Sequence, residues 1–590
     1  MGKFKLFIKK VCNSVKKCYD AVYNKIPYIE PALIISGSLL VALVIIVSVK
    51  GIVSEDVVKF ESNPAEVAFY NNDYEAAITE YEKMQKESDW PFWDVKIAEV
   101  YSIEGRIEKS NQLLSNILIK RNEILSNVSK EKYEKDYKEK DSELINYIVF
   151  TYFMNEEYKA ALSVGEEFIE KYGENKELIK TVYTVYMVDG QKDKAKDILD
   201  KYDVDKESAY DLAVLAEMNI LASNWDNGFT LLKEAFNKDK NEIKSIDVIS
   251  QLAKYDRQGI LEKVEKLIND NPDELVYKMW IANIYAMTNE TANEAIEIIE
   301  KIENDDIGTV PVNIIKLNAY RNLGNDEEAE SALEKIIDNN KNSYIGYYMS
   351  AWQSFNKKDY DKALELSKNS ILENRNYSNN YGILIPEIMM AKEKSEVSES
   401  YFRTALQKEP FNYTIMIKMA EYYADKTTQN EKVRKYYNLA ASLVPNSAEI
   451  YYKLAMIDEL ETKREDAIKN MNKAIEINEL DSKYYRTLGT LYFEEKEYDK
   501  AIENIRNAYA IDEDNGLTLN NAGIYYIVVE EDILRGMENI QAAYDSITSI
   551  MDDDIKAKIS KNYNRAKNIY DNYNSGNEIE IKASDFELFY

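Results

Sequence analysis

Histidine is absent from this chain of 590 residues, and the only cysteines are Cys12 and Cys18. Without histidine there can be no Ser-His or Cys-His catalytic pair, and the commonest general base and zinc ligand are missing. Because both cysteines lie near the N-terminus, residues 19–590 can form neither a disulfide nor a thiolate metal site. We therefore expect a protein that is not an enzyme, that needs no cofactor or metal, and that is stable by packing alone.

Glycine and proline are also scarce, with 18 and 9 residues, whereas hydrophobic residues make up 45% and charged residues 31% of the chain. So few chain-breaking residues argue against a β-sheet protein with many turns. The length exceeds that of one ordinary domain, which is about 100–200 residues. Composition therefore favours an array of long helices.

One long apolar segment lies near the N-terminus, where residues 32–49 contain no charged side chain. Extended through Lys50 to residue 53, the segment would reach about 33 Å as a helix, enough to cross a hydrocarbon core of about 30 Å. A cleaved signal peptide is the alternative, but its apolar region is usually shorter and ends in a small-residue cleavage site, which is missing here. We expect a transmembrane helix at 32–53.

The charges that flank this segment predict its orientation. Seven lysines precede it against only Asp20 and Glu30, and the acidic Glu55 and Asp56 follow it. By the positive-inside rule, residues 1–31 form a basic cytoplasmic juxtamembrane segment, and everything after residue 53 lies outside the cell membrane. The apolar residues of 4–22 recur at helical spacing, so this segment is either an amphipathic helix on an anionic leaflet or a simple orienting tail.

A repeat of 34 residues is visible in the second half of the chain, where residues 448–481 and 482–515 align without a gap. In the second copy, apolar and small residues recur at intervals of three, four and seven on two successive segments, as helical faces require. These residues are Tyr485, Leu488, Gly489 and Tyr492 on the first segment and Tyr498, Ala501, Ile505 and Ala508 on the second. The repeat is thus a helical hairpin.

This order of large, small and aromatic residues resembles the tetratricopeptide repeat family. One small position marks the second helix of each hairpin through the chain, and twelve of its fourteen residues are Ala, Ser or Gly. They are Ala77, Ser110, Ala161, Ala195, Gly228, Ile260, Ala295, Ala329, Ala363, Ser398, Val433, Ala467, Ala501 and Gly536. The resemblance implies an all-α solenoid, or superhelix, of about 14 tetratricopeptide-like hairpins over residues 60–550, after one transmembrane helix.

Beyond the repeats, residues 551–575 are expected to form a polar C-terminal capping helix. Residues 576–590 form a tail that ends with the apolar Phe586, Leu588 and Tyr590. We expect this tail to be frayed, as chain ends usually are, although it could instead pack in the groove of the solenoid or on a partner.

In the resembled family, ligands usually meet the inner face made by the first helix of each pair. The corresponding candidate partner-binding residues are Ile345, Tyr348, Trp352, Phe355, Ile383, Met390, Tyr452 and Met456. Exposed aromatic residues in a groove are typical of peptide sites, but the same residues could simply fill gaps between repeats. No set of Lys and Asn matches the basic clamp by which some relatives hold a carboxylate.

The charge of the chain bears on the kind of partner. The first 50 residues contribute +6 to the total of −30, which leaves −36 on the rest. Nucleic acid would be repelled, so we expect no nucleic-acid partner and a protein or peptide partner instead. The favoured hypothesis is a membrane-tethered scaffold or assembly factor of the bacterial envelope. A cell-wall glycan-binding module that uses the many tyrosines, or an accessory sensor subunit of an envelope complex, are the alternatives.

Overall fold

The computed structural model describes residues 63–173, 175–425 and 429–590, which belong to a single compact unit, 63–590. The predicted transmembrane helix at 32–53 and the basic segment 1–31 lie outside the described residues. Among those that are described, no helix combines the length and the apolar character needed to cross a bilayer.

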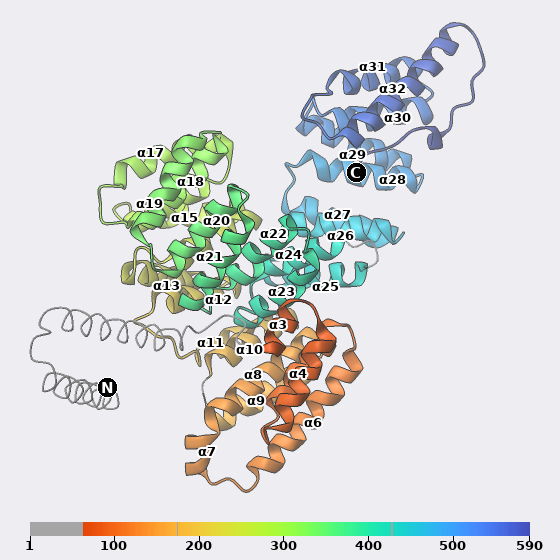
Figure 1. Cartoon of the computed structure of the whole chain (residues 1–590). Helices are drawn as coiled ribbons and strands as arrows, with labels where there is room; N and C mark the ends of the chain where they lie inside the picture. The colour runs from red at the N-terminus through yellow and green to blue at the C-terminus, as the bar shows by residue number, and fades with distance from the viewer. Residues whose placement is uncertain (1–62, 174, 426–428) are drawn as a thin grey trace, which may run out of the picture. The chain divides into compact units, whose positions relative to one another are not determined.

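Helices account for all of the regular structure within the described residues, and most of them form antiparallel pairs (Figure 1). The first seven pairs are α3 (Pro64–Tyr70) with α4 (Tyr74–Lys86), α5 (Phe92–Ile103) with α6 (Ile107–Leu125), α8 (Lys138–Met154) with α9 (Tyr158–Tyr172), α10 (Lys176–Val188) with α11 (Lys192–Leu199), α12 (Ala209–Leu221) with α13 (Trp225–Lys238), α14 (Ile243–Tyr255) with α15 (Arg257–Asp270), and α16 (Leu275–Tyr285) with α17 (Ala292–Ile302). The next seven are α18 (Thr309–Asn322) with α19 (Asp326–Asn339), α20 (Tyr344–Asn356) with α21 (Tyr360–Glu373), the π-helical η2 (Asn380–Leu384) and α22 (Ile385–Ala391) with α23 (Ser398–Lys408), α24 (Tyr413–Ala424) with α25 (Asn430–Leu443), α26 (Ala448–Leu460) with α27 (Arg464–Ile477), α28 (Ser482–Glu494) with α29 (Tyr498–Ile511), and α30 (Gly516–Val528) with α31 (Ile533–Asp545). The prediction of an all-α helical solenoid is confirmed.

Among the α-helices of the described residues, two stand outside the pairs. The short α7 (Lys130–Asp136) lies in the charged stretch where the sequence spacing lengthens between Ser110 and Ala161. After the last pair, α32 (Asp553–Asn574) packs against α31 and α30.

The small position of the repeat is buried in every hairpin. The need for a small residue is clearest where α30 crosses α31. There, a Cβ atom added to Gly536 would lie only 2.8 Å from the carbonyl oxygen of Gly523. A Cβ atom on Gly489 of α28 would likewise lie 3.0 Å from the carbonyl oxygen of Ala501 in α29. The two helices of a pair therefore touch backbone to backbone, which only small side chains permit.

Most hairpins turn through one residue with a positive φ, placed five residues before the small position. The residues are Asn72, Gly105, Glu156, Gly190, Ser223, Gly324, Lys358, Glu393, Thr462, Lys496 and Glu531. At Lys496, for example, φ is 61°, and the next amide, of Glu497, donates to the carbonyl oxygen of Tyr492 at 2.9 Å. This bond ends the first helix as in a Schellman motif. Eight of these eleven residues are not glycine, so most of these hairpins form the left-handed turn without it.

Distant repeats also contact each other along what we call the seam, the contacts of α3–α14 with residues 344–446. Helix α3 packs on α23, and α10 packs on α25. The rings of Tyr70 and Tyr401 are 4.7 Å apart, and Arg403 donates to the hydroxyl of Ser102. The inner face of the early repeats is thus covered by later repeats of the same chain.

A buried charged network lies within the seam. Lys244 of α14 is only 2% exposed and pairs with Glu217 at 2.8 Å and Glu409 at 3.1 Å. Burial alone would lower the pKa of Lys244, but the two carboxylates more than offset this and raise it. Beside this network, the Tyr377 hydroxyl donates to Asp247 at 2.9 Å, and burial raises the pKa of Asp247 to about 7.

Candidate peptide-binding groove

The aromatic residues predicted on α20 lie together at the edge of the seam. The ring of Trp352 is 6.3 Å from that of Tyr348 and 5.5 Å from that of Phe355, in edge-on geometry. Ile345 and Tyr348 are buried, whereas Trp352 and Phe355 are half-buried. Tyr348 also packs 5.1 Å from Tyr377. Part of this predicted surface is therefore already covered by the chain itself.

The other predicted residues are scattered. Ile383 is half-buried in η2, and Met390 is 52% exposed near the end of α22. On α26, Tyr452 and Met456 are half-buried, and the ring of Tyr452 packs 5.7 Å from that of Tyr484. The eight residues thus form separate patches rather than one continuous site, and their role in partner binding stays a prediction.

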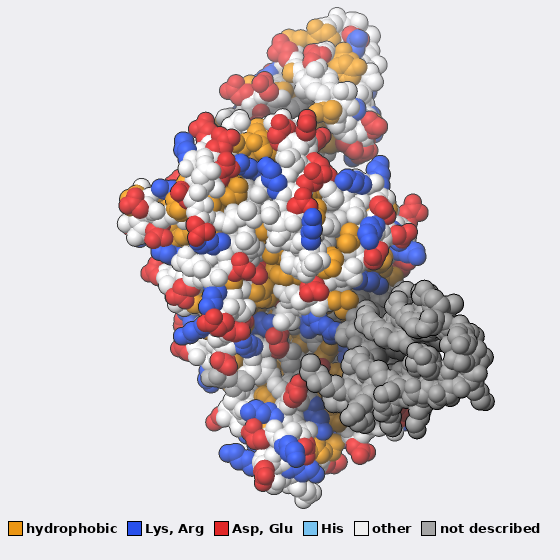
Figure 2. Space-filling view, turned by 60° about the vertical axis from the view of Figure 1, so that its left-hand side comes forward, with side chains coloured by type: hydrophobic (Ala, Val, Ile, Leu, Met, Phe, Trp, Pro, Cys, Tyr) orange, Lys and Arg blue, Asp and Glu red, His pale blue; other side chains and the backbone are white. Residues whose placement is uncertain are grey.

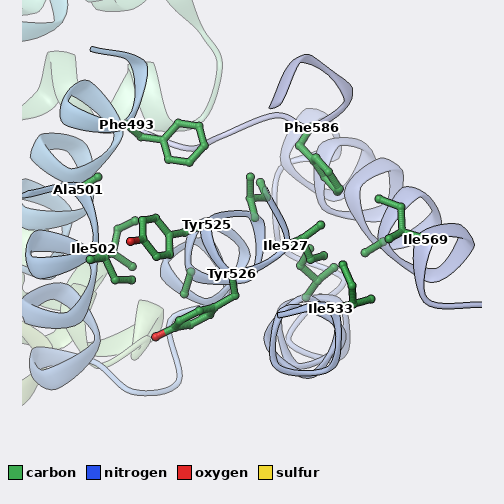
Figure 3. Packing of buried hydrophobic residues seen from close by; sticks show 14 residues of the cluster. Phe493, Ala501, Ile502, Tyr525, Tyr526, Ile527, Ile533, Ile569 and Phe586 are labelled. Atoms are coloured by element: carbon green, nitrogen blue, oxygen red, sulfur yellow. The ribbon is translucent and has the colours of Figure 1, made fainter. Parts of the chain in front are cut away.

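The end of the tail, expected to be frayed, is instead packed against the last repeats. Phe586 and Phe589 are each only 7% exposed. Phe586 is in an extended conformation and belongs to a cluster that includes Ile527 of α30 and Ile569 of α32 (Figure 3). Phe589 packs with Ala543 and Ile559 in a neighbouring cluster. Burial of two phenylalanine rings outweighs the entropy that fraying would gain.

Two asparagines hold the backbone of the tail. The Nδ2 atom of Asn562 donates to the carbonyl oxygen of Glu587 at 2.7 Å, and the Glu587 amide donates back to Oδ1 at 2.9 Å. Asn521 repeats this arrangement with Phe589, at 2.7 and 2.9 Å. In an extended chain, the amide and the carbonyl group of one residue point to the same side, and residues two apart, such as Glu587 and Phe589, point to that same side. A carboxamide carries a donor and an acceptor, so it can satisfy both groups of one residue.

Further polar side chains complete the site. Asn520 donates to the carbonyl oxygen of Glu587 at 3.2 Å, Thr490 to that of Phe589 at 2.8 Å, and Arg486 to that of Tyr590 at 3.1 Å. We call this surface the tail groove, and its polar lining is Arg486, Thr490, Asn520, Asn521 and Asn562. These residues come from α28, α30 and α32 and are all buried.

Charged side chains flank the tail groove. Arg565 pairs with Asp585 at 2.5 Å, and Lys561 pairs with Glu587 at 2.5 Å. At the end of the tail, the Tyr590 hydroxyl donates to Glu494 at 2.6 Å, and burial together with this carboxylate raises the pKa of Tyr590 well above its usual value. On the face shown in Figure 2, acidic and basic side chains are interspersed and form no single patch. The tail groove thus offers local basic partners within an acidic chain.

The asparagines of the tail groove were not predicted. The sequence signal was available for two of them, because Asn520 and Asn521 interrupt the apolar stretch of α30 and would be buried on a helix of that composition. A buried carboxamide needs hydrogen-bond partners, and so it points to a ligand or a neighbouring strand. Asn562 gave no such signal, because most residues of α32 are polar and one more asparagine does not stand out among them.

Comparisons with known proteins match this architecture. Residues 310–343, 448–479 and 482–515 match the tetratricopeptide repeat, and they coincide with α18–α19, α26–α27 and α28–α29. Hsp70-Hsp90 organizing protein 1 of Glycine max is 27% identical over 214 residues, which make up 33% of this chain and 34% of that protein. The match therefore spans only about a third of this relative.

Solved structures with similar helical arrays include the APC/C hetero-tetramer Cut9-Hcn1, which is 14% identical, with a TM-score of 0.38 over 85% of this chain and 95% of that one. Yeast Tom70 is 14% identical, with a TM-score of 0.33 over 86% of this chain and 95% of that one. The repeat matches confirm the predicted tetratricopeptide repeats at the three segments, and the helical pairs around them form a solenoid like those built from such repeats.

Proposed function

We propose that this chain is a membrane-tethered, protein-binding scaffold or assembly factor that presents an acidic repeat solenoid outside the membrane and performs no catalysis. The observation that carries the proposal is the tail groove, in which buried side chains hold an extended segment by its backbone. Tetratricopeptide repeats are suited to this role because their stacked first helices make an inner face long enough for a peptide.

The way in which the tail is held explains why such a surface can serve protein partners. Hydrogen bonds from Asn521 and Asn562 to backbone groups supply affinity without depending on the sequence that is bound. The apolar clusters that receive Phe586 and Phe589 supply selectivity, because only a chain with large apolar side chains at the same spacing would fill them. An extended protein segment is therefore the ligand that fits.

Protein binding can be tested by site-specific photo-crosslinking of the full-length chain in its native cell. A photoreactive amino acid at Met456, half-buried on the inner helix α26, should give a defined crosslinked partner. The same amino acid at Lys469, exposed on α27, is the matched control. If both positions give the same products, or neither gives any, the scaffold proposal fails.

The membrane arrangement is a separate part of the proposal and rests on the uncharged segment 32–49 and the lysines before it. It can be tested with Ser575→Cys, at an exposed position after α32, in a Cys12→Ser, Cys18→Ser background. An impermeant thiol reagent should label this variant on intact, wall-stripped cells. Labelling only after lysis would place the solenoid on the cytoplasmic side and overturn the proposed localisation.

A further inference from the structure

The tail reaches the tail groove through an exposed connection. Residues 573–578 are exposed, and after α32 only the short 3-10 helix η4 (Ala583–Asp585) precedes the extended segment 586–590, in which Phe586 and Phe589 are buried. This extended segment is short, and the bonds to its backbone would fit another extended segment equally well. The tail therefore occupies the groove as a tethered peptide would.

We propose that the tail is a built-in competitor, and that the tail groove takes an extended acidic and aromatic segment of a partner protein when the tail leaves. This inference rests on the proposed function and adds to it the chemistry of the partner. The partner segment would resemble the tail sequence Asp-Phe-Glu-Leu-Phe, with large apolar side chains at its second and fifth positions and carboxylates at its first and third.

The charges of the groove support an acidic ligand. The carboxylates of Asp585 and Glu587 each find a basic partner, Arg565 and Lys561, in a chain whose net charge is −30. Without the tail, these two basic side chains would lose their partners, and Arg486 would lose the carbonyl oxygen of Tyr590. A basic ligand would meet repulsion at all three positions.

The apolar contacts set the spacing of the ligand. Phe586 enters the cluster that contains Ile527 and Ile569, and three residues later Phe589 enters the cluster that contains Ala543 and Ile559. Leu588 lies between them and is only half-buried, so it contributes less. A partner with small side chains at the two phenylalanine positions would leave both clusters open to water.

Because the tail is tethered, its effective concentration at the groove is on the order of millimolar, and an identical free peptide competes poorly. The test therefore uses the full-length chain with a protease site inserted between Asn577 and Glu578, both exposed. After cleavage and gel filtration, the released tail dissociates from a protein that is otherwise unchanged. The probe is a fluorescently labelled peptide with the sequence of residues 584–590, followed by fluorescence anisotropy.

We expect the cleaved chain to bind this peptide at least about tenfold more tightly than the uncleaved chain. Asn521→Ala in the cleaved chain should weaken binding by about tenfold, because it removes both bonds to one peptide residue. Circular dichroism of each sample checks that the repeats stay folded. A control peptide in which both phenylalanines are replaced by alanine should not bind measurably.

Three results would overturn the inference. Equal binding before and after cleavage would mean that the tail is a structural closure and not a competitor. Equal binding of the alanine control peptide would mean that the two apolar clusters do not select the ligand. If the uncleaved chain is a dimer by light scattering and becomes a monomer on cleavage, the occupant is the tail of a second copy. The crosslinking test of the scaffold function is independent of all three.

Discussion

The seam and the tail groove fill the inner face of the same kind of repeat in two different ways. In the seam, helices of α3–α14 meet residues 344–446 through buried charged and aromatic side chains, such as Lys244 between Glu217 and Glu409. In the tail groove, asparagines hold the backbone of a short extended segment. The first arrangement depends on the identity of every side chain, whereas the second binds backbone groups and selects its ligand mainly at the two phenylalanine positions and their flanking carboxylates.

The difference shows which part of the inner face can exchange its occupant. To open the seam, the chain would have to expose a lysine and two carboxylates whose burial is tolerable only while they are paired. To empty the tail groove, it must expose Phe586 and Phe589 and release an extended segment whose backbone bonds water can replace, but it exposes no buried charge network. The seam is therefore a fixed closure, and the tail groove is the exchangeable site.

The largest effect is expected from Lys244→Met in the seam. This substitution leaves Glu217 and Glu409 buried without their cation and should cost about 3–5 kcal/mol of unfolding free energy. The urea midpoint, followed by circular dichroism, measures the loss. Lys238→Met is the control, because its partner Glu207 is 85% exposed, and it should cost less than about 1 kcal/mol. Similar losses for both variants would remove the distinction drawn between seam and surface.

A second test of the seam uses pH. The pKa of Asp247 is raised to about 7, so the folded chain binds a proton that the unfolded chain releases near pH 4. The stability that this proton contributes is present below the unfolded pKa and is lost as the pH rises toward 7. Asp247→Asn, which keeps an acceptor for Tyr377, should therefore stabilise the protein at pH 8 by about 2–4 kcal/mol relative to the parent chain and have little effect at pH 4.

Urea midpoints of the parent chain and of Asp247→Asn at both pH values provide the measurement. The control is Asp270→Asn, which changes an exposed carboxylate at the end of α15. Asp359→Asn would be unsuitable as a control, because Asp359 caps α21. A pH-independent difference between Asp247→Asn and the parent would show that Asp247 is ionised in the folded seam.

A smaller and local effect is expected from Ala501→Leu, near the tail groove. Ala501 is fully buried, and Gly489 lies close to its carbonyl oxygen, so a larger side chain would overpack the crossing of α28 and α29 at a cost of about 1–3 kcal/mol. Because each repeat contacts mainly its neighbours, hydrogen exchange should speed up in α26–α32 and stay unchanged in the seam. Faster exchange throughout the chain would mean that the two regions are coupled.

The smallest effect is expected at the left-handed turn between the two helices of a hairpin, which occurs in both regions. Lys496 has a φ of 61°, where glycine has no steric penalty, so Lys496→Gly should stabilise the chain by about 0.5–1 kcal/mol. Glu495→Gly, at the preceding residue with a φ of −76°, should destabilise it by a similar amount. The same pair of measurements at Lys358 and Lys357 checks the turn on the seam side, where Lys358 also has a φ of 61°.

Much of the fold could be predicted from spacing alone. The small position held its phase from Ala77 to Gly536, and the structure buries every one of its residues, including Ile260 and Val433, which are larger than the repeat prefers. The positive φ five residues earlier was not predicted, because at eight positions it is adopted by non-glycine residues of five different types. At these turns the tertiary packing of the hairpin overrides local preference.

The sequence says less about the candidate site than about the fold, and the partner-binding role of the eight predicted residues stays a prediction. Tyr348 was assigned to an open inner face, but it is buried against Tyr377, a residue of the following repeat. The sequence left open whether these residues form a free surface or fill gaps between repeats, and Tyr348 does the latter, because spacing alone does not show how one repeat packs on the next. The tail was expected to fray as chain ends usually do, whereas its order comes from buried side chains far away in the sequence, such as Asn521, which binds the backbone of Phe589 across 68 residues.

The sequence by itself determined the helical pairs and their order, because the periodicity of apolar and small residues is a local property that each hairpin carries. Only the tertiary structure decided how the inner face is used. Lys244 binds Glu409 across 165 residues, and Phe589 binds Asn521 across 68 residues. The repeat spacing of the sequence therefore predicts neither contact. Which distant residues meet depends on the curvature of the superhelix. This curvature is the sum of small rotations between successive repeats, and the sequence of a single repeat does not determine that sum.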